Sequence, residues 1–244
     1  GGSGVVLLNR EQSDVETFND KYGEVVNFFR TLREHPEELM EKISLTPYSE
    51  KEFEVAKERS GDISDVEQAR RFFLLVNASY NNSVSSPNWS YSVNYSSRGV
   101  SKKISSYDAK INRLAPIAKR LSDVQITNRD AIDVIETFDS DTALIYCDPP
   151  YPPETREFED IYGEEMTVDQ HRDMAETLRS CDAAVAVSSY HSDLYHEEFV
   201  EHGWTRVDAE EKGISASQNS GETRTESLYV NYEVTDDMLE AAFE

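Results

Sequence analysis

Apolar residues recur through the first half of the chain at helical spacing, with polar residues between them. That pattern is typical of amphipathic helices. Two of the stretches begin with Ser49 and Ser64, each followed three positions later by a glutamate, which is the capping-box signature of a helix start. Helices are therefore predicted over residues 22–34, 36–45, 50–59, 65–78 and 105–121.

The second half of the chain alternates short apolar runs with helical stretches. Including one run near the start, strands are predicted over residues 14–18, 124–127, 143–147, 183–188, 204–208 and 227–232, and helices directly after Asp130 and over 167–179 and 192–201. Strand–helix alternation implies an α/β fold with a mostly parallel sheet covered by helices.

The most distinctive motif is Asp148-Pro149-Pro150-Tyr151, which follows the apolar run 143–147. Prolines restrict φ and lack N–H donors, so the turn is stiff and its carbonyls are free to accept hydrogen bonds. Proline also holds the residue before it in extended geometry, which places Asp148 at the tip of the strand. The motif therefore sets hydrogen-bond acceptors beside an aromatic ring, a combination that suits a planar group bearing an amine, such as a nucleobase.

Three further residues of interest, Gly4, Asp20 and Asp130, come at or near the ends of predicted strands. In sheets of parallel strands, ligands bind beyond the carboxyl ends of the strands. Together with Asp148, these residues predict a single site at one edge of the sheet.

Acidic residues outnumber basic ones by 48 to 24, which gives a formal net charge of −24. The bases are 15 arginines and only 9 lysines. An acidic, lysine-poor surface fits a salt-rich cytoplasm, because screening shortens the range of the self-repulsion. We interpret this composition as that of a halophile's protein.

Residues 77–120 depart from the acidic composition, since they hold seven bases and one acid, and the rest of the chain carries −30. Within them, residues 79–101 are rich in tyrosine, asparagine and serine. Basic and aromatic side chains together favour contact with a polyanion, although a solvated basic face and simple loop packing are the alternatives. The candidate contact residues are Tyr80, Asn82, Trp89, Arg98, Lys102 and Lys103.

Composition also narrows the class of protein. No apolar run approaches the ~20 residues that a membrane-spanning helix needs. The five histidines form no convincing set of metal ligands. Cys147 and Cys181 are expected to be buried thiols, which fits a reducing cytoplasm. We therefore expect a cytoplasmic monomer that uses no metal.

Taken together, these residues resemble a Dam-type DNA adenine methyltransferase, a family that carries the Asp-Pro-Pro-Tyr motif and uses S-adenosylmethionine. Residues 148–151 match that motif residue for residue. The family's target-recognition region falls between its second and third strands, where this chain has its aromatic and basic residues. Further segments look like the family's glycine-rich cofactor loop, the acids after its second and third strands, and its later strands: 1–4, 18–20, 128–130, 188–190 and 225–232.

The resemblance implies a Rossmann-like sheet with helices on both faces and a role for each motif. Asp148, Pro149, Pro150 and Tyr151 would form the catalytic turn, on which an adenine flipped out of double-stranded DNA is held and stacked. The cofactor would be bound by Gly1, Gly2, Ser3, Gly4, Asp20, Asp130 and Asp148. Among these, Asp20 would accept hydrogen bonds from the ribose hydroxyls, and Asp130 from the adenine amine of the cofactor.

The resemblance also divides the chain by function. Residues 1–48 would be the N-terminal part of the cofactor-binding catalytic domain, and residues 49–121 an inserted, mainly helical target-recognition region that binds DNA. Residues 122–244 would complete the catalytic domain and carry the motif.

The chain departs from the family at two points. The family's first strand has no counterpart here, so we expect an N-terminally truncated chain whose sheet has an unpaired internal edge. The negative charge predicts DNA binding through aromatic and amide contacts more than through arginine and lysine. Two other functions stay open: a methyltransferase that acts on RNA or on a protein glutamine side chain, and a catalytically silent DNA-binding fragment.

Overall fold

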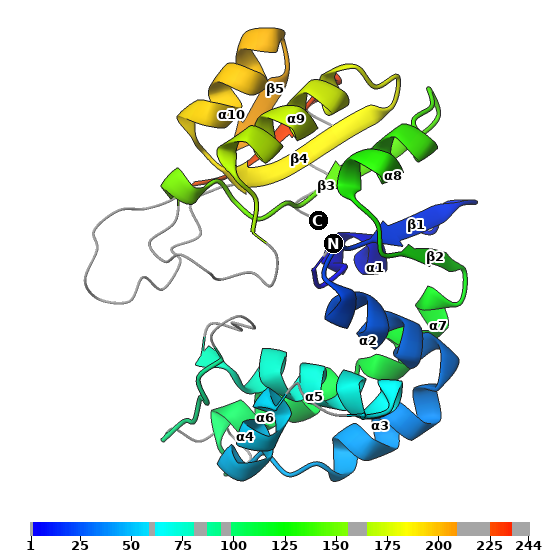
Figure 1. The fold of residues 1–244 in the computed structure, drawn as a ribbon, viewed down its shortest axis with the longest axis vertical. Helices are drawn as coiled ribbons and strands as arrows, with labels where there is room; N and C mark the ends of the chain where they lie inside the picture. The colour runs from blue at the N-terminus through cyan, green and yellow to red at the C-terminus, as the bar shows by residue number, and fades with distance from the viewer. Residues whose placement is uncertain are drawn as a thin grey trace. The chain divides into compact units, whose positions relative to one another are not determined.

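The computed structural model of the chain describes residues 2–58, 62–80, 87–93, 99–155, 165–208 and 225–235. The chain divides into two compact units at Arg129 and Asp130 (Figure 1). We call the described residues from Gly2 to Arg129 the N-terminal unit, and those from Asp130 onward the C-terminal unit, and describe each by itself. The functional division of the chain at residues 48 and 121 stays a prediction.

The N-terminal unit is mainly helical. Two short strands, β1 and β2, pair in parallel, with Glu16 opposite Val124 and Asn19 opposite Thr127. Its elements in chain order are α1 (Val5–Asn9), β1 (Glu16–Asn19), α2 (Gly23–Glu34), α3 (Pro36–Leu45), α4 (Glu50–Lys57), α5 (Asp65–Ala78), α6 (Lys102–Ile111), α7 (Leu114–Leu121) and β2 (Val124–Thr127).

The core of the N-terminal unit is built from aromatic rings. Phe28 of α2 stacks on Phe73 of α5 with ring centroids 5.9 Å apart, and Phe29 meets Phe18 of β1 edge-on at 5.0 Å. Leu32, Leu39 and other aliphatic residues fill the space between α2, α3 and α5. The apolar stripe that the sequence shows along α2 therefore faces both the helices and the small sheet.

The helices predicted over 22–34, 36–45, 50–59 and 65–78 are confirmed to within two residues at their ends. Ser64 accepts a hydrogen bond from the backbone N–H of Glu67, while Ser49 accepts one from Lys51, one residue earlier than the capping box places it.

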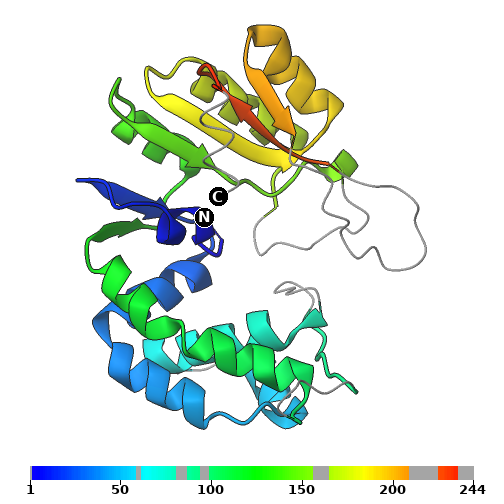
Figure 2. The same ribbon diagram turned by 180° about the vertical axis from the view of Figure 1, so that it is seen from behind.

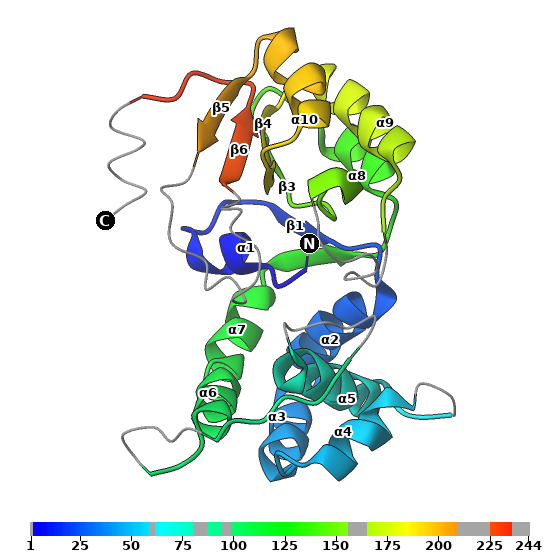
Figure 3. The same ribbon diagram turned by 90° about the vertical axis from the view of Figure 1, so that its left-hand side faces the viewer.

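The single helix predicted over 105–121 is wrong, because the chain forms α6 and α7 with a break at Asn112 and Arg113. Pro116 explains the break. It offers no N–H to the carbonyl of Asn112, and its ring would clash with that carbonyl in a continuous helix. Figure 3 shows α6 and α7 following one another end to end.

The C-terminal unit holds a four-stranded sheet in the order β3-β4-β6-β5. Figure 2 shows β6 in red between β4 in yellow and β5 in orange. The elements are α8 (Ala131–Phe138), β3 (Leu144–Cys147), the 3₁₀ turn Pro153–Thr155, α9 (Val168–Arg179), β4 (Ala184–Tyr190), α10 (Asp193–Glu198), the 3₁₀ turn Val200–His202, β5 (Thr205–Asp208) and β6 (Glu226–Val230).

This sheet is mixed, and the expectation of a mostly parallel one is wrong for it. β3 and β4 are parallel, whereas β6 runs antiparallel to both of its neighbours, β4 and β5. In this unit, the described helices α8, α9 and α10 lie on one face of the sheet (Figure 3). The Rossmann-like layout with helices on both faces is therefore not confirmed, although the fold is a mixed α/β one.

The core of the C-terminal unit lies between the sheet and these helices. Val185 and Val187 of β4 alternate toward α9, where Leu178 is fully buried. Tyr195 of α10 meets Tyr229 of β6 edge-on at 5.6 Å. This ring contact packs α10 against β6.

The N-terminal unit contains an acid whose ionisation stabilises it. Glu67 accepts hydrogen bonds from Arg70 at 2.7 and 2.8 Å and from Arg71 at 2.8 Å. Chiefly because of Arg70, the pKa of Glu67 falls from 4.5 to about 2. A lowered carboxyl pKa stabilises the folded state above about pH 4.5, and that contribution disappears as the pH falls toward about 2.

We therefore expect Glu67→Gln to be less stable than the wild-type protein near neutral pH, with the difference shrinking as the pH falls below 4.5. The measurement is urea unfolding at several pH values, followed by the fluorescence of Trp89 in a Trp204→Phe background. Glu54→Gln, at an exposed acid on α4, serves as the control. A stability difference that stays constant from neutral pH to pH 2 would contradict the assignment.

Candidate active site

We call the motif Asp148–Tyr151 the acid-proline turn. It lies at the carboxyl end of β3, as predicted from the sequence. Asp148 is exposed there, whereas Pro149 and Pro152 are buried. The buried prolines anchor a stretch of backbone whose φ angles they already restrict. The carboxylate of Asp148 is therefore presented to solvent by a rigid support.

Tyr151 is held by residues from two other strands. Its hydroxyl donates to Oε1 of Glu226 at 2.9 Å and lies 3.5 Å from Oγ of Ser188. Its ring meets that of Tyr190 edge-on, with centroids 4.7 Å apart. Because β3 and β4 are parallel and β6 is antiparallel, the ends of β3 and β4 and the start of β6 lie at one edge.

The sequence predicts a site role for Tyr151, but it does not predict that Ser188, Tyr190 and Glu226 contact it or lie beside it. One signal was available: Ser188 and Tyr190 lie at the carboxyl end of a predicted strand, where ligands bind in parallel sheets. Nothing in the local sequence around Glu226 shows that β6 begins beside that end, since its position follows from the antiparallel pairing of β4 and β6.

The electrostatics of this edge keep the phenols of Tyr146 and Tyr151 protonated. Burial, together with the hydrogen bond to Glu226, raises the pKa of Tyr151 above its usual range. Burial also raises the pKa of Tyr146, against the effect of a hydrogen bond from Ser188. Burial raises the pKa of the Cys147 thiol to about 12, so this cysteine is no nucleophile at neutral pH. The chemistry available at the turn is that of carboxylates, hydroxyl donors and aromatic faces.

The glycine segment, residues 1–4 of the chain, contacts Asp20 through its described residue Gly2 in the N-terminal unit. Asp20 follows β1, and its Oδ2 accepts the backbone N–H of Gly2 at 2.6 Å while its Oδ1 accepts that of Tyr22 at 2.8 Å. Gly4 has a φ of +63°, and a side chain there would meet the rings of Phe18 and Phe29. Ser3 is exposed between the two glycines.

Asp130 is the first residue of the C-terminal unit. Its side chain caps α8, with Oδ1 accepting the backbone N–H of Ile132 at 3.1 Å. A carboxylate oxygen can accept more than one hydrogen bond, so capping leaves acceptor capacity for a ligand. The capping role and the predicted ligand role of Asp130 are compatible.

The candidate DNA-contact residues differ in exposure. Tyr80 is 60% exposed, whereas Trp89 is half-buried and packs against Tyr48 with centroids 6.1 Å apart. Lys102 is exposed and Lys103 half-buried, both in the first turn of α6. The predicted roles of Gly1, Asn82 and Arg98 lie outside the described residues.

The structure divides the basic residues of the stretch 77–120 into two groups. Five bases form no ion pair with any of the described residues: Lys102, Lys103, Lys110, Arg113 and Lys119. Burial lowers the pKa of half-buried Lys110, and the positive charge of Lys103 lowers it further. Arg120 instead points inward and forms two contacts with Glu16 of β1, at 2.7 and 2.5 Å. Arg120 therefore belongs to the fold and not to a basic surface.

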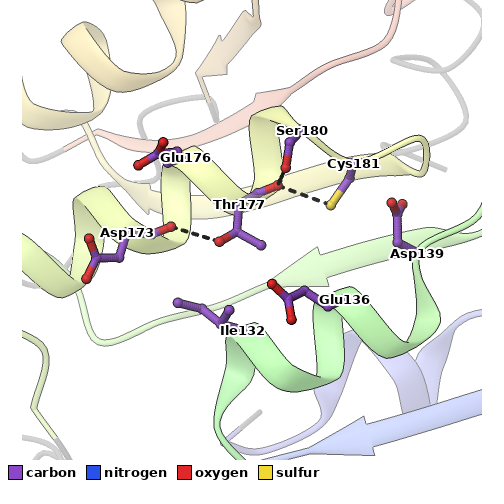
Figure 4. A pocket seen from close by; sticks show the side chains of 8 residues that line it. All are labelled: Ile132, Glu136, Asp139, Asp173, Glu176, Thr177, Ser180 and Cys181. Atoms are coloured by element: carbon purple, nitrogen blue, oxygen red, sulfur yellow. Dashed lines mark hydrogen bonds between the residues drawn. The ribbon is translucent and has the colours of Figure 1, made fainter.

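A groove of about 490 Å³ lies elsewhere in the C-terminal unit, between α8 and α9 (Figure 4). It is lined by Glu136, Asp139, Asp173, Glu176, Ile132, Thr177, Ser180 and Cys181. None of the turn residues lines it, and four carboxylates would repel an anionic ligand. We therefore place the candidate active site at the acid-proline turn.

The described residues show neither a helix long and apolar enough to cross a membrane nor a group of three or more His, Cys, Asp and Glu that could hold a metal ion. Cys147 and Cys181 are both free thiols.

The family model described as D12 class N6 adenine-specific DNA methyltransferase matches residues 1–212 of the chain. That range includes the glycine segment, both acids that follow strands and the whole acid-proline turn. The comparison with curated proteins gave no match.

Proposed function

The chain belongs to the D12 class of N6 adenine-specific DNA methyltransferases, and from that premise we propose how it acts. It transfers a methyl group from S-adenosylmethionine to the exocyclic amine of an adenine that is flipped out of duplex DNA. The observation that carries this proposal is the turn Asp148–Tyr151, with its exposed carboxylate and its aromatic ring held at one edge of the sheet.

The amine of adenine is a weak nucleophile, because its lone pair is delocalised into the ring. In the proposal, Asp148 and the carbonyl of Pro149 accept its two N–H groups and orient the nitrogen. The carboxylate also stabilises the positive charge that develops on this nitrogen as it is methylated. Tyr151 stacks on the base and offsets part of the cost of flipping, since a base–aromatic contact contributes roughly 1–3 kcal/mol.

The residues present fit S-adenosylmethionine, which supplies an activated methyl group on a sulfonium sulfur. Asp20 holds Gly2 against the end of β1, so a carboxylate acceptor and a glycine backbone lie together there. Asp130 offers a second carboxylate at the start of α8. In the proposal Asp20 binds the ribose hydroxyls of the cofactor and Asp130 its adenine amine, and Ser3 and Gly4 are further cofactor-binding residues.

Contact with duplex DNA is proposed for the exposed face of the N-terminal unit. Tyr80 and the loop that contains Trp89 supply aromatic surface, and α6 supplies Lys102 and Lys103. We add Lys110 to this set, because it lies near Lys103 and forms no ion pair within the described part of the chain. Lysines contact phosphates and set affinity and salt dependence, whereas sequence choice depends on base contacts.

The test is an assay with tritiated S-adenosylmethionine and methyladenine-free duplex DNA in molar KCl, a condition chosen for the acidic composition. We expect label in the DNA as N6-methyladenine. In parallel reactions, RNA or protein replaces the DNA. Label in RNA or protein but not in DNA would overturn the proposal in favour of the RNA or glutamine alternative.

Lys103 and Lys110 are proposed phosphate contacts of α6. We expect a Lys103→Gln/Lys110→Gln variant to bind duplex DNA more weakly, with the slope of log K against log salt reduced by about two. Fluorescence anisotropy of a labelled duplex over a KCl series measures this slope. Lys42→Gln is the matched control, because Lys42 of α3 is already paired with Glu38 at 3.4 Å. An unchanged slope would remove these lysines from the DNA contact.

A further inference from the structure

Glu226 is an acid whose presence the stability of the fold does not explain. It is exposed at the start of β6, and none of the described bases forms an ion pair with it. Its described polar contact is the hydroxyl of Tyr151 at 2.9 Å. Glu226 also lies close enough to raise the pKa values of Tyr146 and Tyr151, as does Asp148. Two carboxylates near the same phenols repel each other, and the net charge of −24 adds to that cost.

Glu226 contacts the side chain of Tyr151, which the prolines of the turn do not restrict. Pro149, Pro150 and Pro152 restrict the backbone on both sides of Tyr151. They do not restrict the side-chain torsions of the tyrosine itself, and the torsion of an aromatic ring is broad. The position of the ring therefore needs support from other elements.

Two supports act at different points of the ring. Glu226 from β6 binds the hydroxyl at its tip, and Tyr190 from the end of β4 meets the ring edge-on at 4.7 Å and 76°. Hydrogen bonds to an ionised acceptor are stronger than those between neutral groups, so Glu226 outweighs Ser188, which is 3.5 Å from the same hydroxyl.

We propose that Glu226 is a positioning residue for methyl transfer: its carboxylate fixes the phenol oxygen of Tyr151 and so sets the position of the ring on which the target adenine stacks. The inference rests on the proposed role of Tyr151. Stacking orients the base for transfer, and a misplaced ring lowers the rate of the chemical step without removing a contact to the cofactor.

The test is a double-mutant cycle on the full chain, with tritiated S-adenosylmethionine and methyladenine-free plasmid DNA. We expect Glu226→Ala to lower kcat about tenfold, with KM for S-adenosylmethionine unchanged. Tyr151→Phe keeps the ring but loses the hydroxyl, so it should have a similar effect. The double variant should be no worse than either single one, because both remove the same interaction. Glu226→Gln keeps an acceptor oxygen and should recover most of the rate.

Glu233→Ala is the matched control, an exposed acid just beyond β6, and should behave as wild type. Additive losses in the double variant, or a Glu226→Ala enzyme with wild-type kcat, would overturn the inference. If Glu226 had only a structural role, Glu226→Ala would unfold at a lower urea concentration, as reported by the fluorescence of Trp204, which is buried in the same unit. The KM for S-adenosylmethionine would then change as well.

A second measurement separates this inference from the proposed function. NMR of selectively labelled tyrosine, with the Tyr151 signal assigned from Tyr151→Phe, should show a shifted Tyr151 ring signal in Glu226→Ala, because the ring loses its contact at the hydroxyl. An unchanged Tyr151 signal in that variant would refute the positioning role, whether or not the wild-type protein transfers label. Absence of transfer by the wild-type protein, with the ring effect present, would refute the proposed function alone.

Discussion

Replacing Asp148 with alanine is expected to lower methyl transfer to DNA by about a thousandfold or more, while S-adenosylmethionine still binds. The expected loss is large because, in the proposed mechanism, the carboxylate has two effects on the same nitrogen. It orients the amine before transfer and stabilises the positive charge that develops on it. Neither effect can come from half-buried Tyr151, whose hydroxyl stays protonated and donates to Glu226.

The measurement is single-turnover transfer of tritium from S-adenosylmethionine, with cofactor affinity determined separately by equilibrium dialysis. Asp148→Asn keeps an acceptor oxygen without the charge, and we expect an intermediate rate. Asp141→Ala removes an exposed acid just before β3 and is the control. If cofactor binding disappeared together with transfer in Asp148→Ala, the separation of catalytic and cofactor-binding roles would be wrong.

The second large effect is expected on stability. Glu16 of β1 is 5% exposed, and Arg120 of α7 binds both of its carboxylate oxygens. The hydrogen bond from Arg120 lowers the pKa of Glu16 despite its burial. Arg120→Met would leave a buried carboxylate without its partner, which costs about 3–5 kcal/mol. We expect that loss in the free energy of unfolding of the N-terminal unit.

The two tryptophans of the chain make this measurement possible for one unit at a time. Trp89 reports on the N-terminal unit and Trp204 on the C-terminal unit, so each can be followed in a variant that lacks the other. Arg120→Met should shift the urea midpoint of Trp89 strongly, and Lys119→Met, at the exposed neighbouring base, should not.

Adding Glu16→Gln to Arg120→Met should restore part of the stability, because the unpaired charge is removed. Equal effects of Arg120→Met and Lys119→Met would show that the pair contributes little. Because the folded pKa of Glu16 is lowered, the contribution of the pair is present above the ordinary carboxyl pKa and is lost as the pH falls below it.

Much of the local structure could be predicted, because it depends on residues close together in the chain. The helix over 65–78 follows from Ser64 and the apolar positions that come after it. The end of β3 just before Asp148 follows from the prolines of the motif. The prediction failed at Pro116, where a helical pattern continues through a residue that cannot continue the helix. It failed again for the direction of β6, because one strand pattern serves parallel and antiparallel pairing alike.

The sequence by itself determined the chemistry that we propose for this protein, since Asp148, its prolines and Tyr151 are consecutive and need no tertiary contact to be recognised. Only the tertiary structure decided what surrounds that motif. Glu226 lies 75 residues from Tyr151 along the chain and reaches it through the pairing of β4 with β6. The structure also showed that Arg120 is a buried partner of Glu16, although in the sequence it looks like any other base of the stretch 77–120. Side-chain direction and strand order depend on packing between distant segments, and no local pattern encodes them.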